Sequence, residues 1–472
     1  MPSEKRAHTV DIAVIGAGTA GLAAYRAATA AGERAILIES GSFGTTCARV
    51  GCMPSKLLVA AAEAAHHARH AGRFGVHAAV TVVGREVMDR VRRERDRFVG
   101  FVLSGVEAIP NEHKLLGYAE FVAPGELAVG DVRVHAKAVV IATGSSPVIP
   151  SMLEALGDRL VINDDVFSWE DLPASVVVFG SGVIGLELGQ ALARLGVRVR
   201  VLGRGGALAG LSDPDVARDA LRALRSELSI EPNATVLGVS RRESEVVVRF
   251  KGDDGNAREE SFDYALAAAG RRPNVQKLHL EKAGVVLNAK GIPLYDRTTL
   301  LCAATATGAS AEPVFLAGDV NDDVTVLHEA ADEGRIAGEN AARFPDVRSG
   351  LRSSTLSIVF TEPQIAVVGT RFKDLPTDAP VVTGEVSFID QGRSRVMLQN
   401  HGLLHVYADA RTGLFLGAEL AGPRAEHLGH LLAWAHQQRL TVAQMLLMPF
   451  YHPVIEEGLR TALRDAQSKI AP

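Results

Sequence analysis

Apolar residues along this chain form two blocks with the same pattern. Residues 11–40 (DIAVIGAGTAGLAAYRAATAAGERAILIES) align without a gap on residues 175–204 (SVVVFGSGVIGLELGQALARLGVRVRVLGR). Each block has a short β-branched apolar run, a glycine-rich turn, an Ala/Leu-rich segment with helical spacing, and a second apolar run. The pattern therefore predicts a strand–helix–strand unit in each block, with the helix closed by Gly32 or Gly196.

The turns of both blocks have the spacing Gly-x-Gly-x-x-Gly. The glycines are Gly16, Gly18 and Gly21 in the first block and Gly180, Gly182 and Gly185 in the second. In a dinucleotide-binding unit the first glycine makes the tight turn, the second lets the backbone approach a pyrophosphate, and the third lets the helix pack on the strand. The helix N-terminus then offers N–H groups to the phosphates. We predict two such units, the alternative being two tight turns that only pack helices on strands.

The remaining pattern predicts further elements and a third domain. A helical stretch is expected at about 55–105, followed by strands that end in VVIATGSSPVIP. From about residue 350 the apolar positions alternate and are followed by helices, which indicates a separate α+β domain. The 472 residues exceed what one core usually organises. The expected boundaries are 8–150, 151–278, 279–347 and 348–472.

Charge and hydropathy exclude several classes of partner. Lys plus Arg number 50 and Asp plus Glu 55, and the net charge of -5 offers no broad attraction for nucleic acid or an anionic membrane. No apolar run is long enough to span a bilayer, and the first residues lack the apolar core of a signal peptide. We expect a cytoplasmic protein that acts on a small molecule.

The ends of the second strands indicate different nucleotides. Glu39 lies 23 residues after Gly16, where a carboxylate can accept hydrogen bonds from an adenosine ribose. The same step from Gly180 reaches Gly203, which is followed by Arg204. Loss of the acid removes repulsion toward a 2′-phosphate, and a guanidinium could pair with one. This favours NADP(H) over NAD(H) at the second site, although Arg204 could also be an ordinary surface turn residue.

Two of the three cysteines, Cys47 and Cys52, are five residues apart. In a regular helix they would be separated by about 7.5 Å along the axis and about 140° around it, so a disulfide requires a distorted backbone. Gly51 supplies that freedom, and Cys52 is expected near a helix N-terminus, where the dipole stabilises a thiolate. A plant-type iron–sulfur site needs a third cysteine where Ser55 stands. The pattern favours a redox pair over a structural disulfide or metal ligands.

Other candidate residues have simpler readings. Cys302 has no nearby cysteine and is expected in the core. His66, His67 and His70 fit a solvated helix face better than a metal site. His452 stands five residues before Glu457 in FYHPVIEEGLR. That pair is either the entry to an amphipathic helix or an imidazole held by a carboxylate for proton transfer near neutral pH.

Taken in order, these motifs resemble the FAD-dependent pyridine nucleotide-disulfide oxidoreductases, and most of all the dihydrolipoamide dehydrogenases among them. The resemblance covers nearly the whole chain. Its motifs are the first βαβ unit with Glu39, the C-x4-C-x-P-S-K segment at 47–56, Ala142-Thr143-Gly144, the second βαβ unit, G-R-x-P-N at 270–274, Gly318-Asp319 and the domain after about 350. The implied fold is α/β, with two Rossmann-like dinucleotide-binding domains and a C-terminal α+β dimerisation domain.

The resemblance implies a role for each site residue. Cys47 would exchange with the substrate disulfide, Cys52 would face the flavin as a thiolate, and Lys56 would pair with Glu187 near it. The helix entered through TVLHEAADEG would point its N-terminus at the flavin ring. His452 and Glu457 would be the acid–base pair of the neighbouring subunit in a homodimer. The implied FAD site comprises Gly16, Gly18, Gly21, Glu39, Thr46, Lys56, Thr143, Gly144 and Asp319, and the NAD(P) site comprises Gly180, Gly182, Gly185, Arg204 and Gly270.

The expected reaction is dihydrolipoamide plus NAD(P)+ giving lipoamide plus NAD(P)H, with the lipoyl group free or on a carrier protein. Thr45 and Arg49 depart from the usual G-G-T-C-x-N-x-G-C pattern. Arg49 could lower a thiol pKa or hold an anionic substrate, or it could be a salt-bridged surface residue. Two alternatives therefore stay open: an NADPH-dependent reductase of another small disulfide, and a flavin electron-transfer protein without disulfide turnover.

Overall fold

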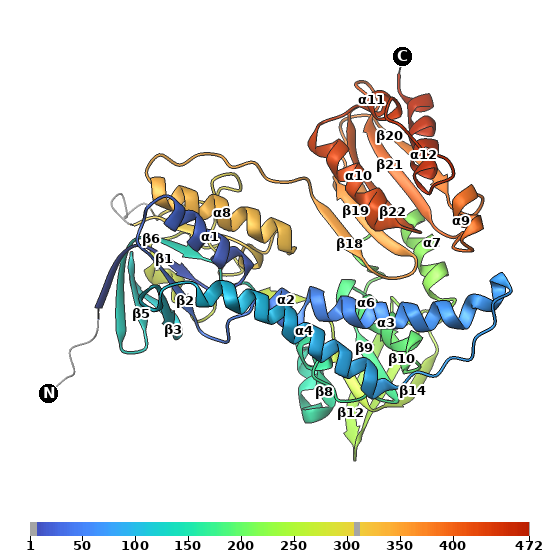
Figure 1. Cartoon of the computed structure of the whole chain (residues 1–472), viewed down its shortest axis with the longest axis horizontal. Helices are drawn as coiled ribbons and strands as arrows, with labels where there is room; N and C mark the ends of the chain where they lie inside the picture. The colour runs from blue at the N-terminus through green and yellow to red at the C-terminus, as the bar shows by residue number, and fades with distance from the viewer. Residues whose placement is uncertain (1–6, 306–311, 472) are drawn as a thin grey trace. The chain divides into compact units, whose positions relative to one another are not determined.

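The computed structural model describes residues 7–305 and 312–471, and the chain divides into two compact units. Unit 1 comprises residues 1–54, 93–147 and 271–353, and unit 2 comprises residues 55–92, 148–270 and 354–472. Two long helices, α3 (Cys52–His70) and α4 (Gly84–Glu107), run from one unit into the other (Figure 1).

Unit 1 is built on a seven-stranded sheet with β1 and β6 at its centre. The order is β3-β2-β1-β6-β5-β4, and β17 pairs with β6. β1 is parallel to both β2 and β6, with Ile12 opposite Ala35 and Ala138. The strands are β1 (Ala7–Ile15), β2 (Ala35–Glu39), β3 (Lys114–Leu116), β4 (Ala119–Ala123), β5 (Glu126–Val129), β6 (Val132–Ile141) and β17 (Val314–Leu316), and a two-stranded sheet pairs β7 (Ser145–Pro147) with β16 (Arg271–Pro273).

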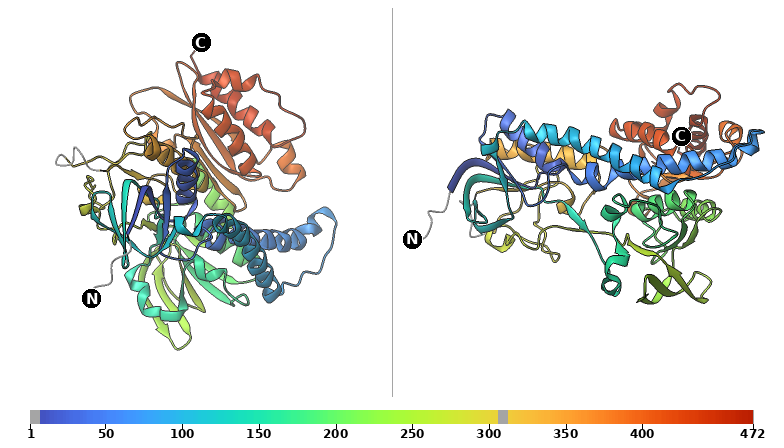
Figure 2. Two further views of the ribbon diagram at one scale, coloured as in Figure 1. Left: turned by 60° about the vertical axis from the view of Figure 1, so that its left-hand side comes forward. Right: turned by 60° about the horizontal axis from the view of Figure 1, so that its bottom comes forward.

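Two helices of unit 1 pack tightly because small residues line their contact. Helix α1 (Thr19–Ala30) lies beside α8 (Leu327–Arg343) in both Figures 1 and 2. A Cβ on Gly334 would stand 2.1 Å from the carbonyl oxygen of Ala20, and one on Gly338 would stand 2.3 Å from that of Ala24. The glycines of α8 therefore set how closely the two helices approach. The other helices of this unit are α2 (Thr46–Val50), η2 (Asn111–His113), η4 (Leu280–Lys282) and η5 (Asp319–Asn321).

The helical stretch expected at 55–105 is two helices with a break between them. After α3 the chain forms a 3-10 turn, η1 (Ala71–Phe74), and then runs without regular structure to α4. Gly75 takes a φ of +79°, a left-handed conformation that caps the turn. The Ala- and Arg-rich composition predicts helix on both sides of this break and does not reveal it. The glycines cause the break.

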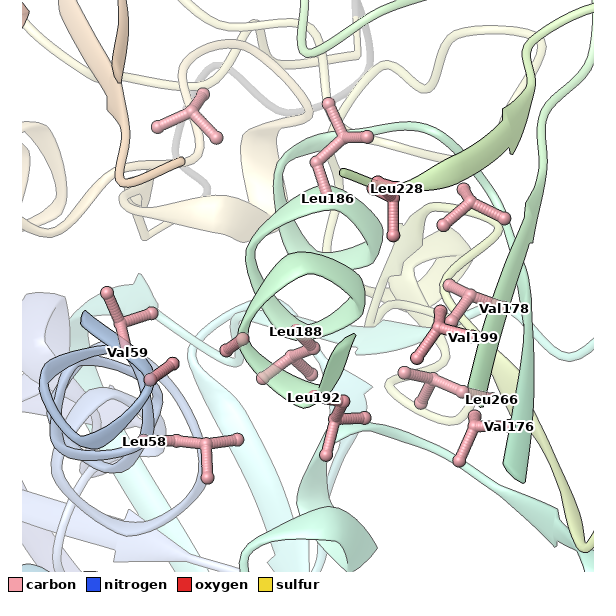
Figure 3. Packing of buried hydrophobic residues seen from close by; sticks show 14 of the residues in the cluster. Leu58, Val59, Val176, Val178, Leu186, Leu188, Leu192, Val199, Leu228 and Leu266 are labelled. Atoms are coloured by element: carbon pink, nitrogen blue, oxygen red, sulfur yellow. The ribbon is translucent and has the colours of Figure 1, made fainter. Parts of the chain in front are cut away.

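The second βαβ unit belongs to unit 2. Its sheet has the order β11-β10-β9-β15-β8, and β9 (Ser175–Phe179) is buried along its whole length between two layers. Figure 3 shows Leu188 and Leu192 of α6 (Val183–Arg194) between Leu58 and Val59 of α3 on one side and strand residues on the other. The remaining elements are η3 (Ser151–Arg159), β8 (Leu160–Val161), α5 (Asn163–Val166), β10 (Arg198–Leu202), α7 (Pro214–Leu224), β11 (Ser229–Glu231), β12 (Thr235–Arg242), β13 (Glu245–Lys251), β14 (Ala257–Phe262) and β15 (Tyr264–Ala267).

Unit 2 also contains the C-terminal antiparallel sheet, with the order β18-β19-β22-β21-β20. Alternation along β21 sends Leu404 and Val406 to the apolar cluster under α10 and α12, and sends His405 and Tyr407 to the opposite face, where α7 packs. The elements are β18 (Leu356–Val359), β19 (Gln364–Gly369), η6 (Phe372–Asp374), β20 (Val381–Ser387), α9 (Gly392–Val396), β21 (Leu403–Asp409), β22 (Phe415–Gly422), α10 (Ala425–Gln437), α11 (Val442–Leu446) and α12 (Glu456–Lys469). Two βαβ units and this separate α+β sheet agree with the predicted fold class.

Candidate active site

The first glycine-rich turn leaves a space at the N-terminus of α1. Gly16 has a φ of +105°, and a Cβ there would stand 2.3 Å from the carbonyl oxygen of Ala142. A Cβ on Gly21 would stand 1.8 Å from the carbonyl oxygen of Gly16, whereas one on Gly18 would meet nothing within 4 Å. Gly16 and Gly21 are thus required by packing, and Gly18 opens the helix N-terminus to a phosphate group.

Glu39 lies against this turn. Its Oε2 accepts a hydrogen bond from the N–H of Ala17 at 2.8 Å, and its Oε1 accepts one from the N–H of Gly41 at 2.8 Å. Each carboxylate oxygen keeps a further lone pair for a ribose hydroxyl. The turn, the open helix end and this carboxylate therefore fit a dinucleotide cofactor.

Three further predicted residues come together within unit 1. The hydroxyl of Thr143 donates to the carbonyl oxygen of Asn274 at 2.8 Å, and the N–H of Asn274 donates to the carbonyl oxygen of Gly144 at 3.0 Å. The carboxylate of Asp319 accepts a hydrogen bond from the hydroxyl of Ser145 at 2.9 Å. Ser145 thus joins the Ala-Thr-Gly turn to the Gly-Asp segment, a partnership that the sequence did not reveal.

The second turn repeats the geometry of the first. Gly180 has a φ of +125°, a Cβ on Gly185 would stand 2.0 Å from the carbonyl oxygen of Gly180, and one on Gly182 would meet nothing within 4 Å. At the ribose position a Cβ on Gly203 would stand 2.2 Å from the hydroxyl oxygen of Ser181. No acidic side chain fits there. The exposed side chain of Arg204 makes no hydrogen bond or ion pair with the residues that the structure describes.

The two candidate redox cysteines flank a break between helices. Cys47 is half-buried in α2, and the exposed Cys52 is the first residue of α3, as its predicted position near a helix N-terminus requires. The break falls at Gly51, where a Cβ would stand 3.1 Å from the carbonyl oxygen of Thr46. By contrast Cys302 is buried, and burial raises the pKa of its thiol, so it is unsuited to attack.

Arg49, between the cysteines, is held by its own loop. Its guanidinium donates to the carbonyl oxygen of Ser42 at 3.1 Å, and its side chain packs on Gly44. The partner is a carbonyl oxygen and not a carboxylate. Among the residues that the structure describes, no carboxylate pairs with the Arg49 guanidinium, so the surface salt bridge considered for it is not formed there.

Lys56 and Glu187 meet within unit 2. Their Nζ and Oε2 atoms are 2.6 Å apart, and Ser55 also donates its hydroxyl to Oε2 at 3.0 Å. The other oxygen of the buried Glu187 accepts the N–H of Phe360 at 3.0 Å. The ammonium of Lys56 lies 4.6 Å from the centre of the Phe360 ring. Two other segments of unit 2, the start of α3 and the segment at Phe360, therefore meet at the carboxylate of α6.

His452 and Glu457 also form the expected pair. The Nδ1 atom of His452 lies 3.0 Å from Oε1 of Glu457, and the N–H of Val454 donates to Oε2 at 3.2 Å. The hydrogen bond with His452 holds the pKa of Glu457 below its ordinary value. The imidazole is 81% exposed, so its Nε2 faces outward from this chain.

His66, His67 and His70 lie on α3 as predicted. His66 faces Glu227, with 3.3 Å between Nδ1 and Oε2. Across residues 7–305 and 312–471, no three His, Cys, Asp or Glu side chains come close enough together to hold a metal ion. No helix in the same residues is long and apolar enough to cross a membrane.

Comparisons with known proteins identify the family. The family described as pyridine nucleotide-disulphide oxidoreductase matches residues 10–334, and its dimerisation domain matches residues 355–463. This chain belongs to that family. Membership of this family supports FAD and a pyridine nucleotide as the cofactors of this chain.

Relatives of this oxidoreductase match it over nearly its full length. A dihydrolipoyl dehydrogenase from Thermus scotoductus is 31% identical over 462 residues, which are 96% of this chain and 96% of the relative. One from Halobacterium salinarum is 30% identical and covers 97% of this chain and 96% of its own. These identities support an enzyme of the same class.

Solved structures confirm the fold of this oxidoreductase. LpdA from Mycobacterium tuberculosis has a TM-score of 0.81 and 25% identity, over 96% of this chain and 99% of its own. The HOCl-induced flavoprotein disulfide reductase RclA from Escherichia coli has a TM-score of 0.79 and 24% identity, over 98% of this chain and 100% of its own. The predicted arrangement with a C-terminal dimerisation domain is thereby confirmed.

Proposed function

We propose that this oxidoreductase oxidises dihydrolipoyl groups to lipoyl groups and passes the two electrons to NAD(P)+ through Cys47 and Cys52. The observation that carries the proposal is the break at Gly51, which sets one cysteine in α2 and the other at the N-terminus of α3. The full-length similarity to dihydrolipoyl dehydrogenases supports the choice of dithiol. Bound FAD would supply the two-electron acceptor between the dithiol and the nicotinamide.

The proposed exchange between substrate and enzyme takes place in two thiol–disulfide steps. One thiol of the substrate, deprotonated, attacks the Cys47 sulfur of the enzyme disulfide, and Cys52 leaves as a thiolate. The second substrate thiol then attacks the mixed disulfide, which releases the oxidised substrate and reduces Cys47. The α3 N-terminus stabilises the thiolate of Cys52, which makes it the better leaving group.

His452 is the proposed base for the substrate thiol. Because its Nδ1 is engaged by Glu457, its Nε2 is left to take the proton. The neighbouring side chains Leu447 and Tyr451 are 84% and 80% exposed. Exposed apolar side chains of this size mark an interaction surface. We propose that this surface joins two copies of the chain, so that His452 of each completes the site of the other.

The pair of Lys56 and Glu187 is proposed to line the flavin, with the N-terminus of α8 directed toward its ring. In the FAD site we place Thr46, Thr143, Gly144 and Asp319 with the glycines and Glu39 of the first βαβ unit. We propose that residues 8–150 and 279–347 are the first and second parts of the FAD-binding domain, that residues 151–278 are the NAD(P)-binding domain, and that residues 348–472 are the dimerisation domain.

For the second site we propose NADP(H), with Gly270 beside the glycines of the turn. The position of Gly203 leaves no room for the acidic side chain that would repel a 2′-phosphate. The exposed guanidinium of Arg204, the next residue, could pair with that phosphate. The substitution Arg204→Ser should raise the KM for NADP+ about tenfold and leave that for NAD+ unchanged. Equal effects on both nucleotides would contradict the assignment.

The test of the whole proposal is steady-state turnover of dihydrolipoamide with NAD+ and NADP+ in parallel, and of NADPH with small disulfides. Turnover of dihydrolipoamide supports it. Reduction of an anionic disulfide by NADPH without dihydrolipoamide turnover would instead favour the second candidate, a reductase of another disulfide. Two observations favour this reductase: the positive charge of Arg49 and the geometry at Arg204.

A further inference from the structure

The loop that follows β10, residues 203–213, is joined to the second glycine-rich turn. The hydroxyl of Ser181, between the turn glycines, donates to the carbonyl oxygen of Ala207 at 2.5 Å. The N–H of Ala209 donates to the carbonyl oxygen of Ser181 at 2.9 Å. Ala209 is buried with a φ of +51°, a left-handed conformation that is unfavourable for a residue with a Cβ. Surrounding contacts therefore hold this loop in one conformation.

The far end of the loop is held by Glu419 of β22. This carboxylate is fully buried and accepts four hydrogen bonds. Ser212 donates its N–H at 2.7 Å and its hydroxyl at 2.5 Å, and the N–H groups of Asp213 and Phe372 donate at 2.8 and 2.9 Å. A buried charge is tolerated when hydrogen bonds satisfy it in this way. The end of the loop is thus fixed to the C-terminal sheet.

Asp213 makes a second connection to the same sheet. Its Oδ1 caps α7 by accepting the N–H groups of Asp215 and Val216, and its Oδ2 accepts the hydroxyl of Tyr407 at 2.8 Å. The same oxygen lies 2.7 Å from Nδ1 of His405. One carboxylate therefore links the helix cap to β21.

His405 lies between two carboxylates. Its Nε2 is 2.9 Å from Oε2 of Glu385, so both ring nitrogens face acceptors and both must carry protons. Burial opposes that charge, but the hydrogen bonds with Asp213 and Glu385 outweigh it and raise the pKa of His405 above 6.5. The imidazole and Asp213 are buried, whereas Glu385 lies at the surface.

The other charged groups facing His405 are mostly acidic. Glu419 is opposite it on β22, and Asp465 of α12 interacts with it electrostatically. Asp465 accepts the N–H of Glu385 and binds the ammonium of Lys469 at 2.7 Å. Four carboxylates thus face two cations in this cluster, which favours retention of the His405 proton.

We propose that the imidazolium of His405 is a positioning residue for the pyridine nucleotide, acting through Asp213 and the loop 203–213 on the turn that receives the pyrophosphate. This inference rests on the proposed function of the second βαβ unit as the nucleotide site. His405 itself touches neither the turn nor Arg204. Loss of its charge leaves Asp213 uncompensated, frees the loop, and weakens nucleotide binding without altering the flavin site.

The consequence is a pH dependence of nucleotide affinity with a fixed sign. Because the pKa of His405 is raised above 6.5, the imidazolium is complete below pH 6.5 and is lost as the pH rises through that higher pKa. Affinity should therefore be full at low pH and fall at alkaline pH. Glu385→Gln removes one of the two carboxylates, so the fall should begin at lower pH. Tyr407→Phe removes a hydrogen bond from a neutral donor, so it should not change the pH at which nucleotide affinity falls.

The test is calorimetric titration of NADP+ and NAD+ into the oxidised holoenzyme from pH 6.5 to 9. His405→Gln should weaken binding about tenfold at pH 6.5, a coupling typical of linked sites, with flavin content unchanged. His405→Lys, which keeps its charge at pH 9, should bind at pH 9 as the wild type does at pH 6.5. His135→Gln, an exposed histidine on β6, is the matched control and should behave as wild type.

The outcomes separate this inference from the proposed function. If the wild type binds nucleotide and His405→Gln binds equally well at every pH, the positioning role is wrong and the proposed function stands. If His405→Gln does not fold, the pH dependence of nucleotide affinity is compared among the wild type, Glu385→Gln and His405→Lys. Identical pH profiles of affinity in all three proteins overturn the inference. If the wild type binds neither nucleotide, the proposed function itself fails.

Discussion

Lys56 of α3 and Glu187 of α6 form an ion pair of 2.6 Å, although 131 residues separate them in the chain. Glu187 has only 4% of its side chain exposed, and Lys56 has 33%. The carboxylate also holds Ser55 and the N–H of Phe360. The pair therefore stabilises the contact of α3 with α6 and fixes where the ammonium lies.

Replacement of Glu187 by Gln should destabilise the protein by about 1–2 kcal/mol. Breaking a buried pair costs more, but the partial exposure of Lys56 reduces the cost of leaving its ammonium unpaired. Chemical denaturation measures the change. Glu339→Gln, which breaks an exposed pair with Arg335 on α8, is the control and should change stability by less than about 0.5 kcal/mol. Equal losses in the two variants would contradict the structural role of Glu187.

Replacement by alanine should affect nucleotide binding at one glycine of the second turn and stability at another. Gly182→Ala meets open space, so the fold should be retained, while the methyl group blocks the phosphate and weakens nucleotide binding about tenfold or more. Gly185→Ala collides with the Gly180 carbonyl oxygen and should lower stability by about 1–3 kcal/mol. Calorimetric binding and thermal unfolding of both variants test this. Normal nucleotide affinity in Gly182→Ala would place the nucleotide elsewhere.

Local patterns in the sequence were sufficient to predict the two βαβ units. The positive φ angles of Gly16 and Gly180 and the close packing of Gly21 and Gly185 follow from the spacing of glycines within one turn. The start of α3 at Cys52 follows in the same way from the local sequence. The composition at 55–105 was misleading because helical propensity continues across a break that Gly75 introduces.

Contacts between distant segments could not be predicted from the same patterns. The pairing of Lys56 with Glu187 was expected only through the family resemblance, and the hydrogen bond between His405 and Asp213 spans 192 residues. Alternation on β21 does place His405 on the face opposite the apolar cluster. It does not identify the helix that packs there, because that depends on how two separate sheets are joined.

His452→Gln should reduce the rate of dithiol oxidation by about 10²–10⁴-fold, because the amide cannot take the thiol proton. Reduction of the bound flavin by NADPH, which needs no thiol proton, should be unaffected. Stopped-flow measurements separate the two half-reactions. His279→Gln is a matched control, since His279 is also an exposed histidine paired with a glutamate, Glu281, at 3.2 Å. An equal loss in both half-reactions would assign His452 to the fold instead of to proton transfer.

Arg352→Met should destabilise unit 1 by an amount that depends on pH. Arg352 pairs with the buried carboxylates of Glu329 and Glu333 at 2.9 and 2.6 Å. Burial raises the pKa of Glu333 to about 7, and Arg352 opposes that rise. Without the guanidinium, ionised Glu333 is uncompensated, so the loss should reach about 3 kcal/mol above pH 7.

The same loss should shrink as the pH falls through about 7, because Glu333 is then protonated in both the wild type and the variant and the buried charge is gone. Denaturation curves at pH 5 and pH 8 measure the difference. Arg335→Met removes an exposed arginine from the same helix and should be nearly neutral at both values. A loss for Arg352→Met that is the same at pH 5 and pH 8 would show that Glu333 is not the group left uncompensated.

The most direct test of the account is turnover of dihydrolipoamide with NAD(P)+ by Cys47→Ser, compared with wild type and with the buried-cysteine variant Cys302→Ala at equal flavin content. The account predicts that Cys47→Ser binds flavin and does not turn over, while Cys302→Ala turns over as wild type does. Turnover by Cys47→Ser at the wild-type rate would contradict the central claim that electrons pass through this cysteine pair.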